Sequence, residues 1–416
     1  MKFADRSAFE EPRAVTCPAC GHHVAVMFFE GGVQPLATIA WPGSAEAARA
    51  MPRLPLDFVR CVECGHVYNA AFDYAAVPYS DKPNLMFNRG VHWKGFIGEI
   101  IDKVAARLPP GSLVIEIGHG DGGFLSALSQ ALPGCRFIGF DPHGATGGEG
   151  SLEFRASMFE PARDFPALRP GLIISRHVLE HLINPLRFLQ TMSFVAACRD
   201  ERPLAYFEVP CIDRAIETRR TVDFYYEHSS QFTTESFTRM IARSAAMVEE
   251  IGHGYGGEVV YGFVRLGHCA GQVGHARGAD GFRRATEAAR GTIAAQLAEL
   301  HRSGRRVAIW GGTGKSAAFM HRYDVDAERF PVVVDSDPAK VGTFVPGTGQ
   351  PIRFRDWLVQ HPADVVIVPP QWRAADIVAE MAANGIAAAE ILIEHDGRLI
   401  DYRCEPHPYG RPDDGR

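Results

Sequence analysis

The sequence has no block of basic residues, no long apolar run and no even set of cysteines. Its 43 Lys and Arg are outweighed by 49 Asp and Glu, which gives a net charge of −6 over 416 residues. Contact with nucleic-acid phosphates needs clustered positive charge, so this balance argues against a nucleic-acid partner. No apolar stretch approaches the length of a membrane span, which argues against a membrane partner. Because the opening residues Met1–Arg13 are too polar for a secretory signal, we expect a cytoplasmic protein.

The cysteines do not form a disulfide framework. Nine is an odd number, and five of them are scattered, namely Cys135, Cys198, Cys211, Cys269 and Cys404. This distribution is typical of a reducing compartment.

The other four cysteines, Cys17, Cys20, Cys61 and Cys64, occur as two C-x2-C-G-H repeats. Two such turns can present four thiolates to one tetrahedral ion. We therefore predict a closed zinc site that serves folding and not catalysis, with a redox or chance pairing as the alternative. We expect His22 and His66 to be exposed and not to bind the ion.

The stretch 113–125, LVIEIGHGDGGFL, predicts a buried strand, a glycine turn and the start of a helix. Glycines allow the backbone to approach a ligand closely, and a helix begins with unpaired N–H groups. This turn is therefore expected to bind a nucleotide-like cofactor.

Two cofactors compete for this turn, and a purely structural turn is a third possibility. Gly118, Gly120 and Gly123 satisfy the G-x-G-x-x-G pattern of NAD-binding proteins. However, Glu116 and Asp121 would repel a pyrophosphate. They favour S-adenosylmethionine (SAM), which carries an ammonium and a sulfonium and no phosphate, and E-x-G-x-G-x-G resembles motif I of class I SAM-dependent methyltransferases.

Asp141 follows the second expected strand, 23 positions after Gly118. There its two carboxylate oxygens can accept the ribose hydroxyls of the cofactor. The alternative is an N-cap of a helix that starts at Pro142.

Strand and helix signals alternate over residues 113–268, which predicts an α/β fold with a mostly parallel sheet covered on both faces. We divide the chain into a zinc module (1–75), a SAM-dependent methyltransferase domain (76–268), a glycine-rich linker and an amphipathic helix (269–303), a second Rossmann-like domain (304–403) and a disordered tail (404–416). The helix, from Phe282 to Arg302, is expected to pack back across the catalytic domain. Because Ile309 stands where a P-loop needs glycine, the turn Gly311–Ser316 is not a P-loop.

Two histidines follow the fourth expected strand. His177 and His181 are four residues apart with Glu180 between them, at the edge of the sheet where ligands bind. A metal site would need a third ligand at a recognisable spacing, which the sequence does not provide. We therefore assign His177 to the cofactor site and expect a histidine to face the substrate.

The segment Asp223–Thr233 contains Tyr225, Tyr226, Glu227 and His228 in succession. A histidine can take up a proton near neutral pH, and a nearby carboxylate raises its basicity. The segment is too polar for a core, so we predict acid/base chemistry here, with a hydrogen-bonded loop as the alternative. Thr233 or Thr234 is expected to cap the next helix.

Taken together and in this order, the four cysteines, EIGHGDGGF, RHVLEHL, FYYEH and the second Rossmann-like unit resemble the C-methyltransferases of nucleotide-linked 4-keto-deoxysugars. The similarity extends from about Cys17 to about Leu399, and residues 333–342 and 345–348 match that family's D-x-x-P-x-K-x-G…PGT pattern. The resemblance implies that the last domain helps to hold a nucleotide-linked sugar substrate.

The resemblance also implies roles for single residues. The Y-x-E-H spacing falls on Tyr225, Glu227 and His228, and the family's histidine after the fourth strand matches His181. Its tyrosine between the zinc module and the first catalytic helix matches Tyr79. The chain departs from the family at His119, where a small residue is usual, and in the stretch after Tyr79.

The expected reaction is methylation of the carbon next to a ketone. His228 would remove the α-proton, Glu227 would orient His228 or share its charge, and a tyrosine or His181 would stabilise the enolate oxygen. Glu116 and Asp141 would hold SAM. The alternatives are O- or N-methylation of a small molecule, a zinc-ribbon protein that binds nucleic acid or modifies RNA, and a degenerate methyltransferase kept as a scaffold.

Overall fold

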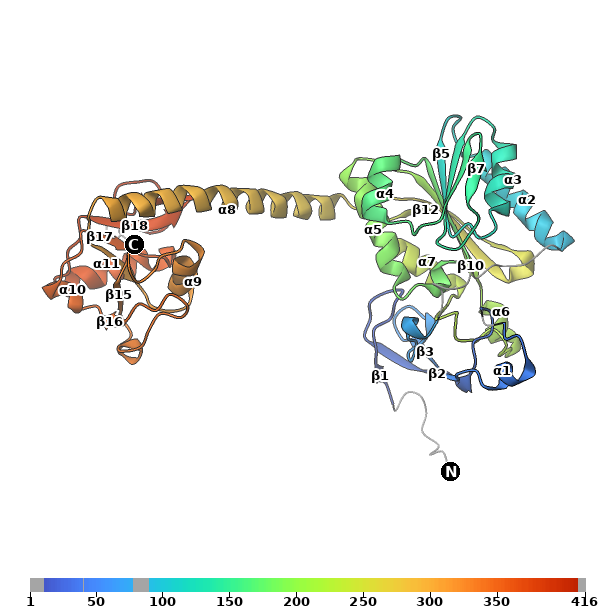
Figure 1. Cartoon of the computed structure of the whole chain (residues 1–416), viewed down its shortest axis with the longest axis horizontal. Coiled ribbons are helices and arrows are strands. Elements are labelled where there is room, and N and C mark those ends of the chain that lie inside the picture. Colours follow the sequence, from blue (N-terminus) through green and yellow to red (C-terminus); the bar gives the residue numbers. More distant parts are fainter. Residues whose placement is uncertain (1–10, 40, 78–89, 411–416) are drawn as a thin grey trace, which may run out of the picture. The chain divides into compact units, whose positions relative to one another are not determined.

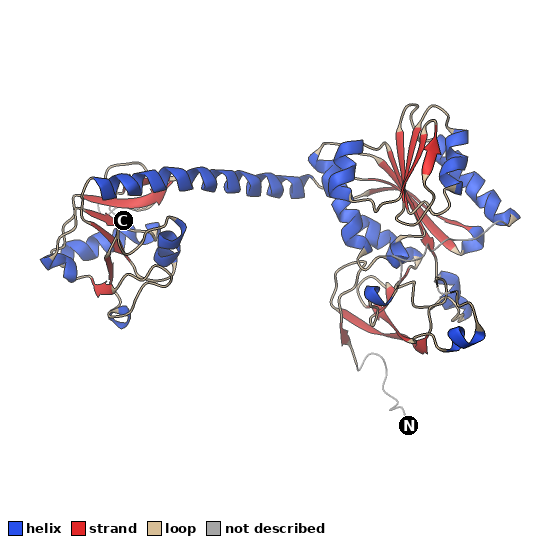
Figure 2. Cartoon of the chain, viewed as in Figure 1, coloured by secondary structure: helices blue, strands red, loops and turns tan. Residues whose placement is uncertain are grey.

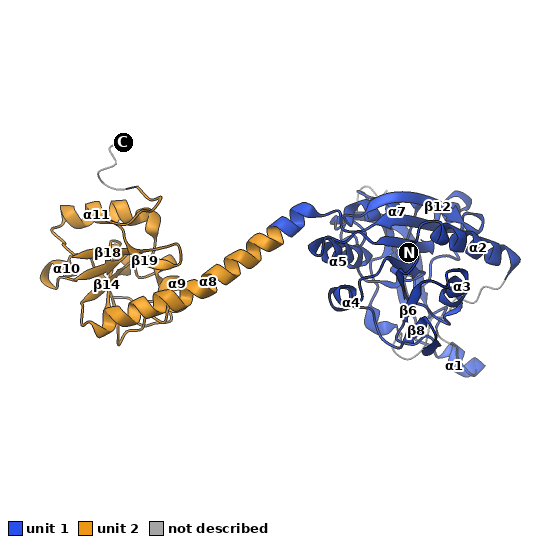
Figure 3. Ribbon diagram, turned by 90° about the horizontal axis from the view of Figure 1, so that it is seen from above, with its two compact units in different colours: residues 1–274 blue, residues 275–416 orange. Residues whose placement is uncertain are grey.

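The computed structural model describes residues 11–39, 41–77 and 90–410, and these form two compact units, 1–274 and 275–416 (Figure 3). Tyr79 lies outside the described residues. None of the described helices is both long and apolar enough to cross a membrane.

The first unit begins with a five-stranded antiparallel sheet (Figure 1). Its strands are β1 (Arg13–Ala14), β2 (Val24–Gln34), β3 (Leu54–Cys61), β4 (Val67–Asn69) and β11 (Ser230–Gln231), with the short helix α1 (Ala45–Arg49) in the β2–β3 connection and a 3₁₀ turn, η1 (Tyr74–Ala76), after β4. Strand β11 comes from far along the chain and pairs with β4, Ser230 opposite Tyr68. The core behind it joins Leu56 and Phe58 to Phe224 and Tyr226. The cysteine-bearing sheet therefore shares both a strand and a core with the predicted catalytic segment.

The second sheet has eight strands in the order β12-β13-β10-β9-β5-β6-β8-β7. Figure 2 shows helices on both sides of this sheet. The strands are β5 (Leu113–Ile117), β6 (Arg136–Phe140), β7 (Gly147–Glu149), β8 (Leu152–Arg155), β9 (Leu172–Arg176), β10 (Leu204–Pro210), β12 (Met247–Gly254) and β13 (Val259–Arg265). The five strands from β10 to β8 run parallel, whereas β12, β13 and β7 are antiparallel to their neighbours. The expected α/β fold with a mostly parallel sheet is confirmed.

Helices cover both faces of this sheet, which explains why β5 is apolar at consecutive positions. Val114 packs with α2 (Val91–Ala105) and α3 (Gly123–Ala131), whereas Ile115 packs on the opposite face with α5 (Pro185–Cys198) and α7 (Thr234–Arg243). The remaining helices are α4 (Pro161–Leu168) and α6 (Asp213–Thr218). Thr233 caps α7 as expected, through a bond from the Ser236 N–H.

The expected linker at 269–281 is wrong. Residues Ala270–Arg302 form one helix, α8. Its glycines each cost about 1 kcal/mol relative to alanine, but the helix lacks proline and is rich in Ala and Arg, which favour a helix. The helix packs within the second unit, where Ile293 and Leu297 lie in the core and Gln296 exchanges two hydrogen bonds with the Leu399 backbone.

The second unit holds a six-stranded sheet in the order β16-β15-β14-β17-β18-β19. Its elements are β14 (Val307–Trp310), α9 (Lys315–Arg322), β15 (Val332–Asp335), β16 (Ile352–Phe354), α10 (Trp357–Gln360), β17 (Val365–Ile367), α11 (Ala374–Ala383), β18 (Glu390–His395) and β19 (Arg398–Asp401). Part of the expected disordered tail folds onto this unit, since His407 stacks on Tyr402 and Tyr409 packs against the core.

Candidate active site

The glycine turn between β5 and α3 is shaped by contacts that exclude side chains. Gly118 has φ +76°, and a Cβ added to it would lie 2.4 Å from Val178 Cγ2. Gly122 has the same φ, and its Cβ would lie 2.5 Å from the Phe154 ring. The Gly118 N–H donates to the Phe140 carbonyl at 2.7 Å, which fixes the turn against β6. Any larger residue at Gly118 or Gly122 would displace the turn.

Asp141 braces this turn from the end of β6. Its Oδ2 accepts the Gly120 N–H at 3.1 Å and its Oδ1 accepts the His143 N–H at 2.8 Å. The next element is the strand β7, so the reading of Asp141 as a helix N-cap is wrong. A carboxylate accepts about four hydrogen bonds, so both oxygens retain capacity for ribose hydroxyls.

Glu116 lies under the turn, with 2% of its surface exposed. Burial raises the pKa of its carboxyl to about 8, although Arg176 on the neighbouring strand β9 opposes the shift. A cation brought next to Glu116 would favour the carboxylate. The site is therefore suited to the ammonium group of an amino-acid-like ligand and unsuited to a phosphate.

Replacing Glu116 with Gln is expected to flatten the pH dependence of stability. The pKa of Glu116 rises from 4.5 to about 8 on folding, so the native protein holds the extra proton between these values and loses stability as the pH rises through them. Glu116→Gln removes this loss, which amounts to about 1.4 kcal/mol per pKa unit. Melting temperatures at pH 5 and pH 8 should therefore differ less in the variant than in the wild type.

The exposed Glu99→Gln is the matched control and should keep the wild-type pH dependence. The stability of Glu116→Gln should still depend on pH to some extent, because the pKa of His177 is raised to about 9 and its stabilising charge is also lost at high pH. If the melting temperature changed by the same amount between pH 5 and pH 8 in Glu116→Gln and in the wild type, a raised pKa of Glu116 in the native state would be contradicted.

A chain of buried ion pairs continues from β9 to β10. Arg176 Nη2 lies 3.0 Å from Glu208 Oε1, and His177 Nε2 lies 2.9 Å from the same oxygen. Burial opposes ionisation of Glu208, but these two cations hold its pKa at about 2. His177 Nδ1 lies 3.5 Å from Glu180. The structure thus places the predicted cofactor residue His177 in ion pairs between two carboxylates, and sequence reasoning assigned no role to Arg176 or Glu208.

The predicted acid/base residues meet in one cluster. The rings of His181 and His228 lie edge to face, with centroids 4.7 Å apart and an interplanar angle of 72°, and the Tyr225 hydroxyl lies 2.8 Å from His228 Nε2. His181 Nδ1 lies 2.7 Å from the Glu227 carbonyl oxygen. Burial lowers the pKa of His228 well below 6.5, and His181 and His177 lower it further. His228 is therefore neutral at pH 7, as a base must be before it accepts a proton.

Glu227 has a partner that the sequence did not reveal. Its fully buried carboxylate accepts the backbone N–H groups of Ala37 and Thr38, each at 2.7 Å, and the Thr38 hydroxyl at 3.2 Å. These residues belong to the loop after β2. Glu227 thus ties the catalytic segment to the cysteine-bearing sheet, and it reaches His181 through its backbone and not through its carboxylate.

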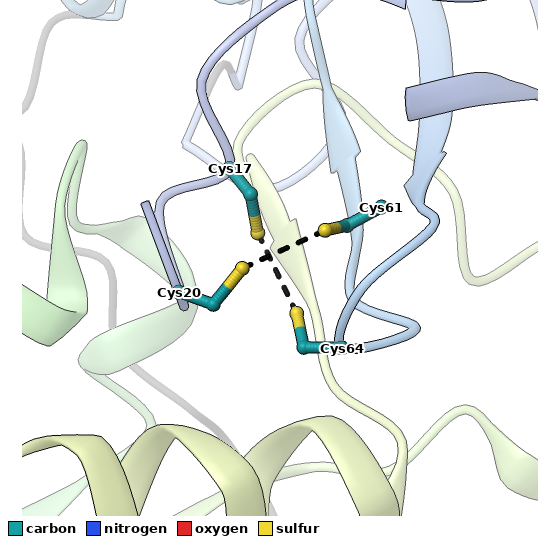
Figure 4. A group of neighbouring side chains, drawn as sticks. All are labelled: Cys17, Cys20, Cys61 and Cys64. Carbon is teal, nitrogen blue, oxygen red and sulfur yellow. Dashed lines mark hydrogen bonds between the residues drawn. The ribbon is translucent and has the colours of Figure 1, made fainter. Parts of the chain in front are cut away.

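The four paired cysteines converge as predicted (Figure 4). The sulfur of Cys17 lies 3.7 Å from that of Cys64, and the sulfurs of Cys20 and Cys61 are 3.6 Å apart. A tetrahedron with Zn–S bonds of about 2.3 Å has edges of about 3.8 Å, so the four sulfurs fit one such ion.

The expectation that His66 is exposed is wrong. It is completely buried, and its Nε2 lies 3.1 Å from the Ser230 hydroxyl on β11. Burial lowers its pKa to about 3. His66 therefore supports the contact between the cysteine-bearing sheet and β11, whereas His22 is half-buried.

Comparison with known proteins assigns a family description to each unit. Residues 90–244 match the family model described as a methyltransferase domain, and residues 271–393 match the model described as the C-methyltransferase C-terminal domain. No curated protein matches the chain.

Among solved structures, one SAM-dependent methyltransferase from Aquifex aeolicus is 13% identical, covers 47% of this chain and 99% of its own, and has a TM-score of 0.32. The magnesium protoporphyrin IX methyltransferase of Synechocystis PCC 6803 is 13% identical, covers 44% of this chain and 90% of its own, and has a TM-score of 0.33. The assignment depends on the family models and not on these structures. The chain is an enzyme that transfers methyl groups, with a methyltransferase domain and a C-methyltransferase C-terminal domain.

Proposed function

We propose that this methyltransferase alkylates the carbon next to the ketone of a nucleotide-linked 4-keto-deoxysugar. The observation that supports this proposal best is the neutral, half-buried His228, whose ring contacts that of His181 and whose Nε2 lies 2.8 Å from the Tyr225 hydroxyl. Methylation of a hydroxyl or an amine does not need a paired-histidine site for an enolate, whereas an α-carbon has to lose a proton before it becomes nucleophilic.

His228 is the base in this mechanism. With its Nε2–H donated to the Tyr225 oxygen, Nδ1 carries the lone pair that removes the proton from the α-carbon. The C–H electron pair forms the carbon–carbon double bond of the enolate, and the π electrons of the ketone move to its oxygen. His181 stabilises this developing charge in its protonated form, with Nδ1–H on the Glu227 carbonyl and Nε2–H on the enolate oxygen. The α-carbon then forms a bond to the methyl group as the carbon–sulfur bond breaks, and the proton stays on His228 until product leaves.

The glycine turn would hold the methyl donor. In this proposal Asp141 binds the ribose and Glu116 the ammonium group, and the turn at Gly118 and Gly120 admits close contact with the ligand. SAM supplies the electrophilic methyl group. The protein orients this methyl group toward the enolate, and such a proximity effect lowers the activation free energy by about several kcal/mol.

We assign a structural zinc ion to Cys17, Cys20, Cys61 and Cys64. Both cysteine turns close with the same hydrogen bonds, from Gly21 to the Cys17 carbonyl and from Gly65 to the Cys61 carbonyl. Four protein ligands leave no open position for catalysis. The ion would instead stabilise the sheet that pairs with β11, directly after His228.

A surface pocket of about 440 Å³ is the proposed entrance for the sugar. It is lined by Leu182, which follows His181, and by Tyr74, Asn184 and Arg187. Arg187 is exposed and offers a positive charge to the pyrophosphate of a nucleotide-linked sugar.

Hydrogen exchange at the substrate tests this function. The protein is incubated in D₂O with nucleotide-linked 4-keto-deoxysugars and without SAM, and deuterium uptake at the α-carbon is followed by mass spectrometry. The wild type is expected to catalyse exchange, because removal of the α-proton precedes methyl transfer. Methyl transfer without any exchange, with the methyl group recovered on oxygen or nitrogen, would contradict the proposal.

A further inference from the structure

Glu180 is a buried carboxylate with too little compensating charge. It is 1% exposed and belongs to the 3₁₀ turn η2 (Leu179–His181) after β9. Three donors lie around the neighbouring carboxylate of Glu208, namely Arg176 at 3.0 Å, His177 at 2.9 Å and the Tyr206 hydroxyl at 2.5 Å. Glu180 has only the His177 Nδ1 contact at 3.5 Å, and neither of its oxygens forms a hydrogen bond within the described residues. Because burying such a carboxylate is costly, a further cation is expected beside it.

Two imidazoles and this carboxylate together form a set of possible metal ligands. Glu180, His181 and His228 each bring one ligand atom to within 4.8 Å of the other two. Ligands at about 2.1 Å from one ion lie about 3 to 4 Å apart, so side-chain shifts of about 1 Å would complete the site. Two of the ligands adjoin each other in sequence, and the third comes from the segment before β11, which explains why residue spacing did not reveal the set.

The hydrogen bonds of both histidines are those of metal ligands. The Glu227 carbonyl oxygen can only accept, so His181 Nδ1 carries the proton and Nε2 keeps the lone pair of the neutral ring. His228 Nε2 lies 2.8 Å from the Tyr225 hydroxyl, which can accept a proton from it and leave Nδ1 with the lone pair. Histidines that bind metal usually hold their other nitrogen in such a bond, which fixes the tautomer and the ring orientation.

We propose that Glu180, His181 and His228 form a second metal site, separate from the four cysteines, for a divalent first-row transition ion. Two imidazole nitrogens and one carboxylate suit Zn²⁺, Fe²⁺, Co²⁺ or Ni²⁺, whereas Mg²⁺ and Ca²⁺ prefer oxygen ligands alone. Three protein ligands leave coordination positions open to water or substrate.

An ion at this site inhibits the enzyme. It occupies the His228 lone pair that would otherwise remove the α-proton, so ion and proton compete for one nitrogen. This consequence depends on the proposed function, but binding of the ion does not.

Cobalt binding tests the site in the full-length, zinc-loaded protein without SAM or sugar. We expect one additional Co²⁺ with visible d–d absorption and without the thiolate-to-cobalt charge-transfer band in the near ultraviolet. Glu180→Gln and His228→Ala should each weaken Co²⁺ binding at least about tenfold, since each removes one of three ligands. The exposed Glu99→Gln should bind Co²⁺ like the wild type.

Retained zinc and an unchanged circular dichroism spectrum would show that the variants are folded. Absence of the additional Co²⁺, a charge-transfer band that reports binding to cysteines, or equal affinity in folded Glu180→Gln would each overturn the site. In the deuterium exchange assay, saturating Co²⁺ should abolish exchange by the wild type, and unaltered exchange would overturn the competition for His228. If no keto-sugar shows exchange even without Co²⁺, the proposed function fails while the binding result stands.

Discussion

His228→Ala is expected to lower the turnover of methyl transfer at least about 100-fold, the scale typical of a lost general base. The dissociation constant of SAM should stay near the wild-type value, because His228 contacts Tyr225 and His181 and takes no part in the glycine turn. Turnover is measured with saturating substrate, and SAM binding is measured by calorimetry. A loss of SAM affinity as large as the loss of turnover would indicate a structural role.

The pH profile gives this variant a second readout. Burial holds the pKa of His228 well below 6.5, so the base of the wild-type enzyme is still unprotonated at pH 6.5. Turnover should therefore begin to fall only at a pH below 6.5. The residual activity of His228→Ala should lack this fall. His275→Ala, an exposed histidine on α8, is the matched control and should retain both the turnover and the acidic fall. Wild-type turnover in His228→Ala would remove His228 from the mechanism.

Loss of the four-cysteine site is expected to have the second largest effect. A structural zinc ion contributes folding free energy directly, with apparent values on the order of 10 kcal/mol in small zinc-binding domains. Cys17→Ser should therefore lower both zinc content and melting temperature. Turnover should fall at least about tenfold, as for the loss of a supporting metal contact, because β4 and β11 pair directly after His228 and Glu227 is anchored on the same module.

Cys198→Ser is the control for this experiment. Cys198 is exposed on α5, so its replacement should leave zinc content, melting temperature and turnover unchanged. Binding of SAM to Cys17→Ser should be affected less than turnover, because the glycine turn belongs to the eight-stranded sheet and not to the cysteine-bearing sheet. Full zinc content and activity in Cys17→Ser would show that the four thiolates do not form the site.

The sequence predicted an element of the fold correctly where the conformation follows from the residues of that element alone. The strand Leu113–Ile117 lies where its apolar run placed it, because both faces of a parallel sheet are buried. The turn at Gly118 needs positive φ, and glycine adopts that conformation without strain. The reading failed at α8, where glycines indicated a linker but the surrounding helix-forming residues dominated.

Residue types and spacing alone indicated the four-cysteine cluster, the glycine turn and the grouping of Tyr225 with His228. The last two are each encoded within a few consecutive residues, and the cysteines stand out because the same short motif occurs twice. The tertiary structure alone decided what these groups face: Glu227 accepts from Ala37, 190 positions away, and His66 is buried against Ser230, 164 positions away. It also placed Glu180 beside His228. Such contacts depend on how strands and loops from distant parts of the chain are brought together, and no local pattern carries that information.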